Sequence, residues 1–204
     1  MTTLKSQNFC SLDLELNNKK DGSVPRIIEV GIAIGNPQDP ENIKSVNWYL
    51  DPQEPITEFI TQLTGISDET IKEKAVSHET AAREIGELLR LYDCYTSPIT
   101  WGGSGHSSDA EELLQEFRDR NIHFPFFGRR IMDVKTLYVF DKLVAGNSPK
   151  GGLSRAMRNC GLEFQGTPHR AICDAENTLR FFFYYLNRSR KLKENLKSLE
   201  SLNF

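Results

Sequence analysis

The sequence predicts an α/β fold, in which a mixed five-stranded sheet is flanked by helices. Strand-like runs joined by short polar loops fill the first 50 residues. Helical periodicity then dominates, and two short apolar runs within this later part each lead into a helix. At 204 residues the chain is long enough for one domain with a buried core, with or without an extension.

The first predicted strand, residues 9–16, has two chemically different faces. Its side chains alternate from Ser11 onward, which places Asp13 and Glu15 on the same face as Ser11. The opposite face is apolar and consists of Cys10, Leu12, Leu14 and Leu16. The two carboxylates lie about 6.6 Å apart and repel each other, since a strand rises about 3.3 Å per residue. The pair therefore indicates either half of a metal site or an edge strand whose polar face is in water.

The remaining elements follow from their periodicity and from the loops that bound them. Residues 27–35 are mostly apolar, which favours a central strand, and residues 43–50 complete an antiparallel meander of three strands. Two short parallel strands are expected at residues 97–101 and 131–134. Helices are expected over residues 56–63 and 77–91, from Asp109, after residue 134 as far as Leu143, over 153–160 and from about Arg170.

Composition narrows the class of protein. Hydrophobic residues make up 38% of the chain and charged residues 26%, which is typical of an ordinary globular protein. No apolar run approaches the roughly 20 residues of a membrane span, and the N-terminal residues lack the apolar core of a secretory signal. The four cysteines are scattered, which favours reduced thiols and a cytoplasmic location. The net charge of −3 argues against a surface that coats DNA broadly, although it permits a local basic rim.

Two predicted divisions of the chain follow from the charge pattern near its end. Residues 1–187 are expected to form the domain. Residues 188–204 are rich in Lys, Glu and Leu, and we expect them to form a charged helical extension or tail.

The spacing Asp-x-Glu is a weak signal by itself. It occurs four times, starting at Asp13, Asp39, Asp109 and Asp174. The second occurrence lies in a predicted polar loop, and the last two lie on predicted helices, where residues two apart point about 200° away from each other. Only the first pair is expected on a strand, with both carboxylates on one face.

Two further acidic residues are candidates to complete a site. Asp109 follows Ser107 and Ser108, either of which can cap a helix, and a carboxylate in the first turn is favoured by the helix dipole. Asp109 is therefore either a residue that starts a helix or a ligand at the carboxyl end of the fourth strand. Asp174 is expected in the first turn of the last helix, away from its apolar stripe.

His169 lies just before that last helix, behind a glycine and a proline. A histidine on such a loop can move, and its pKa near neutrality suits a general base. The alternative is an exposed loop histidine without a role. His78, His106 and His123 do not follow a glycine and a proline in this way and are interpreted as structural or exposed.

Taken in this order, these residues resemble the DEDDh (DnaQ-like) 3′–5′ exonucleases over about residues 8–187. Residues 63–66, Leu-Thr-Gly-Ile, resemble a segment of that family, and residues 169–178 resemble its third motif closely. Residues 153–162 are similar to the Eri1/KapD-type branch, which favours RNA. The first motif departs from the family pattern, since Leu16 and Asn17 follow the glutamate where a threonine is usual.

The resemblance implies a ribonuclease H-like fold with two Mg²⁺ or Mn²⁺ ions. Their ligands would be the carboxylates of Asp13, Glu15, Asp109 and Asp174, with Asp13 bridging both ions. The ions would activate a water and stabilise the leaving 3′ oxygen while His169 takes the proton of the water. The substrate would be the 3′ end of single-stranded RNA or DNA, and the products 5′-mononucleotides. The substrate contacts would come from Leu16, Leu63, Thr64 and Arg170.

Two other functions remain open from the sequence. One is a nucleic-acid-binding or regulatory module that has kept the fold and lost most of its turnover. The other is a phosphodiesterase that acts on short oligonucleotides. The chain is expected to be a monomer or a homodimer, and the sequence does not identify a protein partner.

Overall fold

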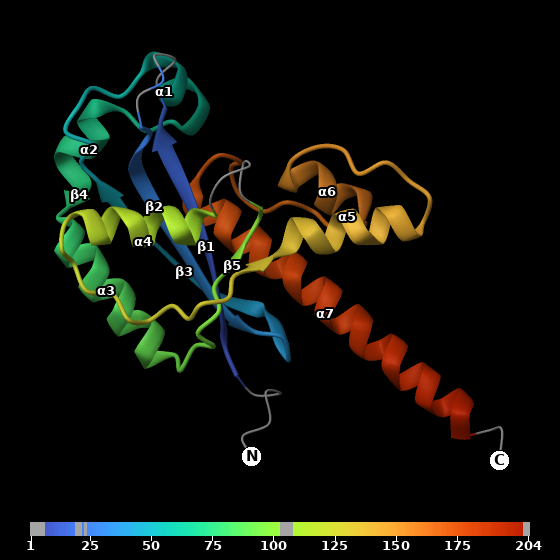
Figure 1. Ribbon diagram of the computed structural model, residues 1–204. Coiled ribbons are helices and arrows are strands. Elements are labelled where there is room, and N and C mark those ends of the chain that lie inside the picture. The colour runs from blue at the N-terminus through green and yellow to red at the C-terminus, as the bar shows by residue number, and fades with distance from the viewer. Residues whose placement is uncertain (1–6, 19–21, 23, 103–107, 202–204) are drawn as a thin grey trace.

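The computed structural model describes residues 7–18, 22, 24–102 and 108–201, and shows a mixed sheet with helices on both of its faces (Figure 1). The strands lie in the order β4-β3-β2-β1-β5-β6. Their bounds are Phe9–Asn17 for β1, Arg26–Asn36 for β2, Asp39–Leu50 for β3, Ala75–Val76 for β4, Ile99–Thr100 for β5 and Met132–Asp133 for β6. The predicted α/β class and its ribonuclease H-like arrangement are confirmed.

The pairing of the strands matches the predicted meander and adds one strand. β1, β2 and β3 pair antiparallel, whereas β5 is parallel to β1 and β6 is parallel to β5. The prediction of five strands was wrong, because β4 pairs parallel with the end of β3 and gives the sheet a sixth strand. β4 is only two residues long, which is too short to show an alternating pattern in the sequence.

The described part of the chain has seven helices, of which the last three follow the final strand. Their bounds are Glu58–Thr64 for α1, Asp68–Lys74 for α2, His78–Leu91 for α3, Asp109–Asp119 for α4, Val134–Val144 for α5, Leu153–Asn159 for α6 and Ala171–Ser201 for α7. α2 was not expected from the sequence. This helix has one buried apolar side chain, Ile71, so it lacks an apolar stripe. None of the described helices is long and apolar enough to cross a membrane.

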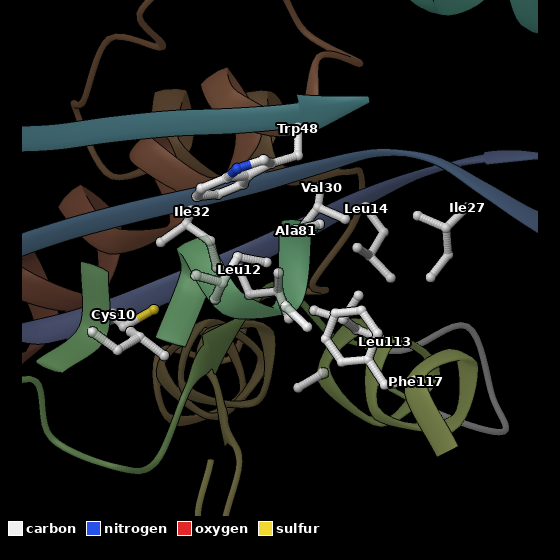
Figure 2. Close-up of a cluster of buried hydrophobic side chains, with 14 of the residues drawn as sticks. Cys10, Leu12, Leu14, Ile27, Val30, Ile32, Trp48, Ala81, Leu113 and Phe117 are labelled. Carbon is white, nitrogen blue, oxygen red and sulfur yellow. The ribbon is translucent and has the colours of Figure 1, made fainter. Parts of the chain in front are cut away.

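One face of the sheet packs on α3 and α4. The apolar face of β1 lies in this layer, as predicted, and Figure 2 shows the cluster, which includes Cys10, Leu12, Leu14, Ala81, Leu113 and Phe117. β1 lies between β2 and β5, and β2 is buried along nearly its whole length. The interpretation of β1 as an edge strand in water is therefore wrong, and its acidic face points into the other layer of the molecule.

That other layer is formed by α7 together with α5 and α6. α7 packs along β1, β2 and β3, and its apolar side chains form a second core with those of α5 and α6. The helix approaches β2 so closely at Gly31 that a side chain there is excluded, since a Cβ atom would lie 2.1 Å from the carbonyl carbon of Ala171. Gly31 is the register partner of Asp13, so the close approach brings the start of α7 beside the acidic face of β1.

A buried ion pair fixes the start of α7 to β2. The Glu29 side chain has no exposed surface, and its Oε1 accepts from Arg170 Nη2 at 2.9 Å while its Oε2 accepts from Arg170 Nε at 3.2 Å. Oε2 also accepts from the backbone N–H of Ala171 at 3.0 Å, and Oε1 from Asn47 Nδ2 at 2.6 Å. Arg170 donates further to the hydroxyl of Tyr49. A bidentate pair with these added bonds sets the direction as well as the position of the helix end.

The structure corrects the expectation for residues 39–41 and extends the one for the end of α7. Asp39 and Glu41 lie at the exposed start of β3, because the hairpin turn falls earlier, at residues 37–38. The first Asp-x-Glu pair is therefore not alone on a strand, although the second pair is exposed and Glu41 pairs with Arg180. α7 continues without a break to Ser201, so residues 188–201 are a helical extension, whereas the division into a domain and a tail stays a prediction.

We expect Gly31→Ala to destabilise the protein by roughly 1–3 kcal/mol, which is typical of overpacking, because backbone atoms of α7 cannot yield as a flexible side chain would. Equilibrium urea denaturation would measure the change. Gly152→Ala is the matched control, since a Cβ atom at Gly152 meets nothing within 4 Å. Equal stability of the two variants would show that the close approach of α7 to β2 carries no constraint.

Candidate active site

Four carboxylates from three separate elements converge on one side of the sheet. Asp13 and Glu15 come from β1, Asp109 is the first residue of α4, and Asp174 lies in the first turn of α7. The side-chain ligand atoms of Glu15, His169 and Asp174 lie within 4.8 Å of one another. The structure thus brings together the residues that the sequence analysis predicted, including both the acidic pair and the histidine.

Asp109 starts a helix, as one of its two expected roles had it, while its role as a ligand stays a prediction. It starts α4 behind a capping box, in which Ser108 Oγ accepts from the Glu111 N–H at 3.3 Å and Glu111 Oε2 accepts from the Ser108 N–H at 3.1 Å. Its carboxylate also acts on the cluster, because its negative charge raises the pKa of Asp13. Ser107, the other predicted cap, and His106 lie outside the described residues.

The electrostatics of the cluster favour a cation. Burial raises the pKa of Asp13 well above its usual range, and the charges of Asp109, Asp174 and Glu15 raise it further. Burial and the neighbouring carboxylates raise the pKa of Glu15 to about 8, while the guanidinium of Arg170 offsets this only in part. Burial is also the main cause of the pKa of about 7 for Asp109 and of about 6 for Asp174. Without added positive charge, Asp13, Glu15 and Asp109 therefore retain protons to a large extent near pH 7.

The donor set fits hard divalent cations. All four groups are carboxylates, they are mostly removed from water, and they raise one another's pKa. Oxygen ligands of this kind suit Mg²⁺ and Mn²⁺, and a bound cation would relieve the repulsion that the raised pKa values record. The carboxylates of Asp13, Glu15, Asp109 and Asp174 are thus the residues that would hold such ions.

His169 is held by its backbone while its ring remains exposed. Its N–H donates to Asp174 Oδ2 at 2.8 Å, and its φ of 61° lies in the left-handed region that non-glycine residues rarely adopt. The same bond lowers the pKa of Asp174 against the effect of burial. His169 is therefore an exposed loop residue, as the alternative expected, and its ring still reaches two carboxylates of the cluster.

The four residues predicted to contact substrate have different environments. Leu63 is 38% exposed on α1 and remains available. Thr64 is buried, and its hydroxyl donates to the Ile60 carbonyl at 2.8 Å and accepts from the Ile66 N–H at 3.1 Å, so this side chain closes a helix end. Arg170 donates to Glu29 and Tyr49, which gives it a positioning role, and its predicted substrate contact stays a prediction. Leu16 packs partly against the core beside α3 and α4, and its substrate contact stays a prediction.

Two residues that the sequence analysis missed support the site from behind. Glu29 is one, and a lone acidic residue inside the apolar run 27–35 was the signal that could have found it. Asn17 is the other, because its buried amide donates to Glu54 and to the Pro55 carbonyl and accepts from the Thr57 N–H at 3.0 Å. Thr57 caps α1, so Asn17 joins the end of β1 to the helix that carries Leu63.

Comparisons with known proteins give the family of the chain. The RNase T family model, described as exonuclease, matches residues 10–182. ERI1 exoribonuclease 2 of Mus musculus is 28% identical over 179 residues, which cover 79% of this chain and 25% of the relative. The chain therefore spans about a quarter of the length of that curated relative.

Solved structures share the fold at low sequence identity. The nuclease domain of 3′hExo, a DEDDh family member bound to rAMP, has a TM-score of 0.74 and 17% identity, covering 92% of this chain and 95% of that domain. E. coli Exonuclease I in complex with a dT13 oligonucleotide has a TM-score of 0.69 and 14% identity, covering 93% of this chain and 43% of that chain. Because the family model spans most of its length, this chain belongs to the RNase T exonuclease family, and ERI1 exoribonuclease 2 is among its relatives.

Proposed function

We propose that this protein is a metal-dependent 3′–5′ exonuclease that releases 5′-mononucleotides from single-stranded nucleic acid. The observation that carries the proposal is the partly buried cluster of four carboxylates with the exposed His169 beside it. RNA is the favoured substrate, because the relative from mouse is described as an exoribonuclease and the 3′hExo domain was solved with rAMP. The free cysteines support a cytoplasmic location.

Two divalent cations held by the four carboxylates would supply the positive charge that the phosphate and the leaving oxygen need. His169 Nδ1 or Nε2 takes the proton of the attacking water, whose oxygen forms a new bond to phosphorus. The bond from phosphorus to the 3′ oxygen breaks, and that oxygen leaves with a proton as the new 3′ hydroxyl of the shortened strand. Asp174 keeps the His169 backbone in place through its hydrogen bond, so the ring stays beside the cluster.

A second candidate is a nucleic-acid-binding module with little turnover, which the unusual residues Leu16 and Asn17 would favour. The structure gives Asn17 a supporting role behind α1, so this departure from the family motif does not by itself remove a group needed for the chemistry. A phosphodiesterase acting on short oligonucleotides would share the site and differ only in how long a strand it accepts.

The direct test uses purified protein, Mn²⁺ and matched RNA and DNA oligonucleotides labelled at the 5′ end. We expect a ladder of shortened products, a faster reaction on RNA, and 5′-mononucleotides as the released species. Asp174→Asn is expected to lower the rate by at least about 100-fold, because it removes an anionic ligand from the metal site while its amide oxygen can still accept from the His169 N–H. Asp39→Asn, on the exposed start of β3, is the matched control and should keep the rate. An intact rate for Asp174→Asn, or no shortening by the wild type, would refute the proposal.

Metal binding and stability should depend on pH in opposite directions. The pKa values of Glu15, Asp109 and Asp174 are raised to about 8, 7 and 6, above the usual carboxyl values near 4. In the metal-free protein the folded state therefore binds more protons than the unfolded state, so these groups should reduce stability as pH rises from about 4 to about 8. Mg²⁺ must displace the same protons, so its affinity should increase between about pH 6 and pH 8.

Thermal unfolding with excess Mg²⁺ and with EDTA would measure both effects. We expect the gain in Tm from Mg²⁺ to be larger at pH 8 than at pH 6, since stabilisation by a ligand grows with its affinity. The gain should be much smaller in Asp174→Asn. An equal gain at both pH values, or one that survives in this variant, would show that the ions bind elsewhere.

A further inference from the structure

We propose that Arg155 and Arg158 on α6 form a binding site for backbone phosphates upstream of the bond that is cleaved. The inference rests on the proposed function and adds the part of the substrate that α6 would hold. A cavity of about 550 Å³ opens beside the catalytic cluster, and Arg155, Arg158, His169 and Asp174 all line it. Two arginines thus share one cavity with two residues of the cluster.

The side chains of the two arginines have no structural partner among the described residues. Both are exposed, and neither side chain forms an ion pair or a hydrogen bond with another described residue. They lie three residues apart on α6, so they project from the same side of the helix, where two like charges are mildly destabilising. Arg170, by contrast, is occupied by Glu29. The pair on α6 therefore offers donors to a ligand and contributes nothing evident to the fold.

The backbone before α6 makes room for one of these side chains. Gly151 has a φ of 98°, and a Cβ atom there would lie 2.5 Å from Arg155 Cδ. The stem of Arg155 therefore lies against Gly151, which limits its freedom and directs it along the cavity. An arginine that is partly ordered before binding loses less conformational entropy when it contacts a phosphate.

A second cavity gives the path beyond the arginines. It has a volume of about 510 Å³ and shares Ser154, Arg158 and Pro168 with the first. Its other walls come from residues 161–164 and Gly166. Arg158 therefore stands where the two cavities meet. A nucleic-acid strand whose terminal phosphate lies at the carboxylate cluster would pass Arg158 as it leaves the site. The evenly spaced phosphates of that strand could then contact both arginines.

The ligand is the upstream backbone, and the predicted position of the terminal nucleotide supports this assignment. Leu63, the exposed residue predicted to contact that nucleotide, is on α1. Figure 1 shows α1 at one end of the sheet and α6 beside α5, away from α1. Guanidinium groups recognise phosphate oxygens through paired donors and read no base, so this site would raise affinity for any single strand of sufficient length.

The test assays the full chain on two substrates, one long and one minimal, and compares the rates. The long substrate is a 12-nucleotide RNA, and the minimal one is the p-nitrophenyl ester of thymidine 5′-monophosphate, which has no upstream phosphate. For Arg155→Ala/Arg158→Ala we expect kcat/KM on the RNA to fall at least about tenfold, mainly through KM, and kcat/KM on the ester to stay within about twofold of the wild type. Arg83→Ala/Arg118→Ala removes two exposed arginines from α3 and α4 and is the charge-matched control.

A binding measurement separates failure of this inference from failure of the proposed function. Fluorescence anisotropy with the same RNA and Ca²⁺ should show that the slope of log Kd against log salt concentration falls by about 1.4 in the α6 variant, because two phosphate contacts to a single strand are lost. RNA cleavage and a salt slope equal to those of the control variant would overturn the inference, as would equal losses on both substrates. A wild type that hydrolyses neither substrate would instead refute the proposed function, and the salt slope would still decide whether α6 binds phosphates.

Discussion

The docking of the first turn of α7 onto β2 is the interaction on which the site depends. Gly31 lets the two backbones meet, and the buried pair of Glu29 and Arg170 fixes where the helix begins. His169 lies just before α7 and Asp174 lies in its first turn. Any shift of α7 would therefore separate them from Glu15. The catalytic geometry is thus held by contacts that lie behind the acidic face and contact no substrate themselves.

The same docking explains why the site tolerates so much buried negative charge. Hydrophobic packing of α7 against the sheet supplies a large favourable free energy, while the carboxylates oppose it through desolvation and mutual repulsion. The packing of α7 therefore offsets the electrostatic repulsion within the carboxylate cluster. A bound cation would remove most of the repulsion between the carboxylates, so metal binding and stability are linked in this protein.

The sequence was informative where periodicity and motif spacing coincide. The alternation in β1 predicted both its core face and the acidic pair, and the order of Asp109, His169 and Asp174 predicted the remaining cluster. It failed for β4 and α2, which are too short or too polar to leave a pattern. It could not show that Arg170 is occupied, because its partner Glu29 lies far away in sequence and meets it only after folding.

Calorimetric titration of Mn²⁺ at pH 8 into the wild type and Arg170→Lys tests most directly whether the docking of α7 assembles the site. Lysine keeps the positive charge near Glu15 but cannot donate twice to Glu29, so any loss of affinity must come from the position of α7. We predict a Kd at least about fivefold weaker in the variant, with an unchanged circular dichroism spectrum. An unchanged Kd in a folded variant would contradict the claim that the docking of α7 assembles the site.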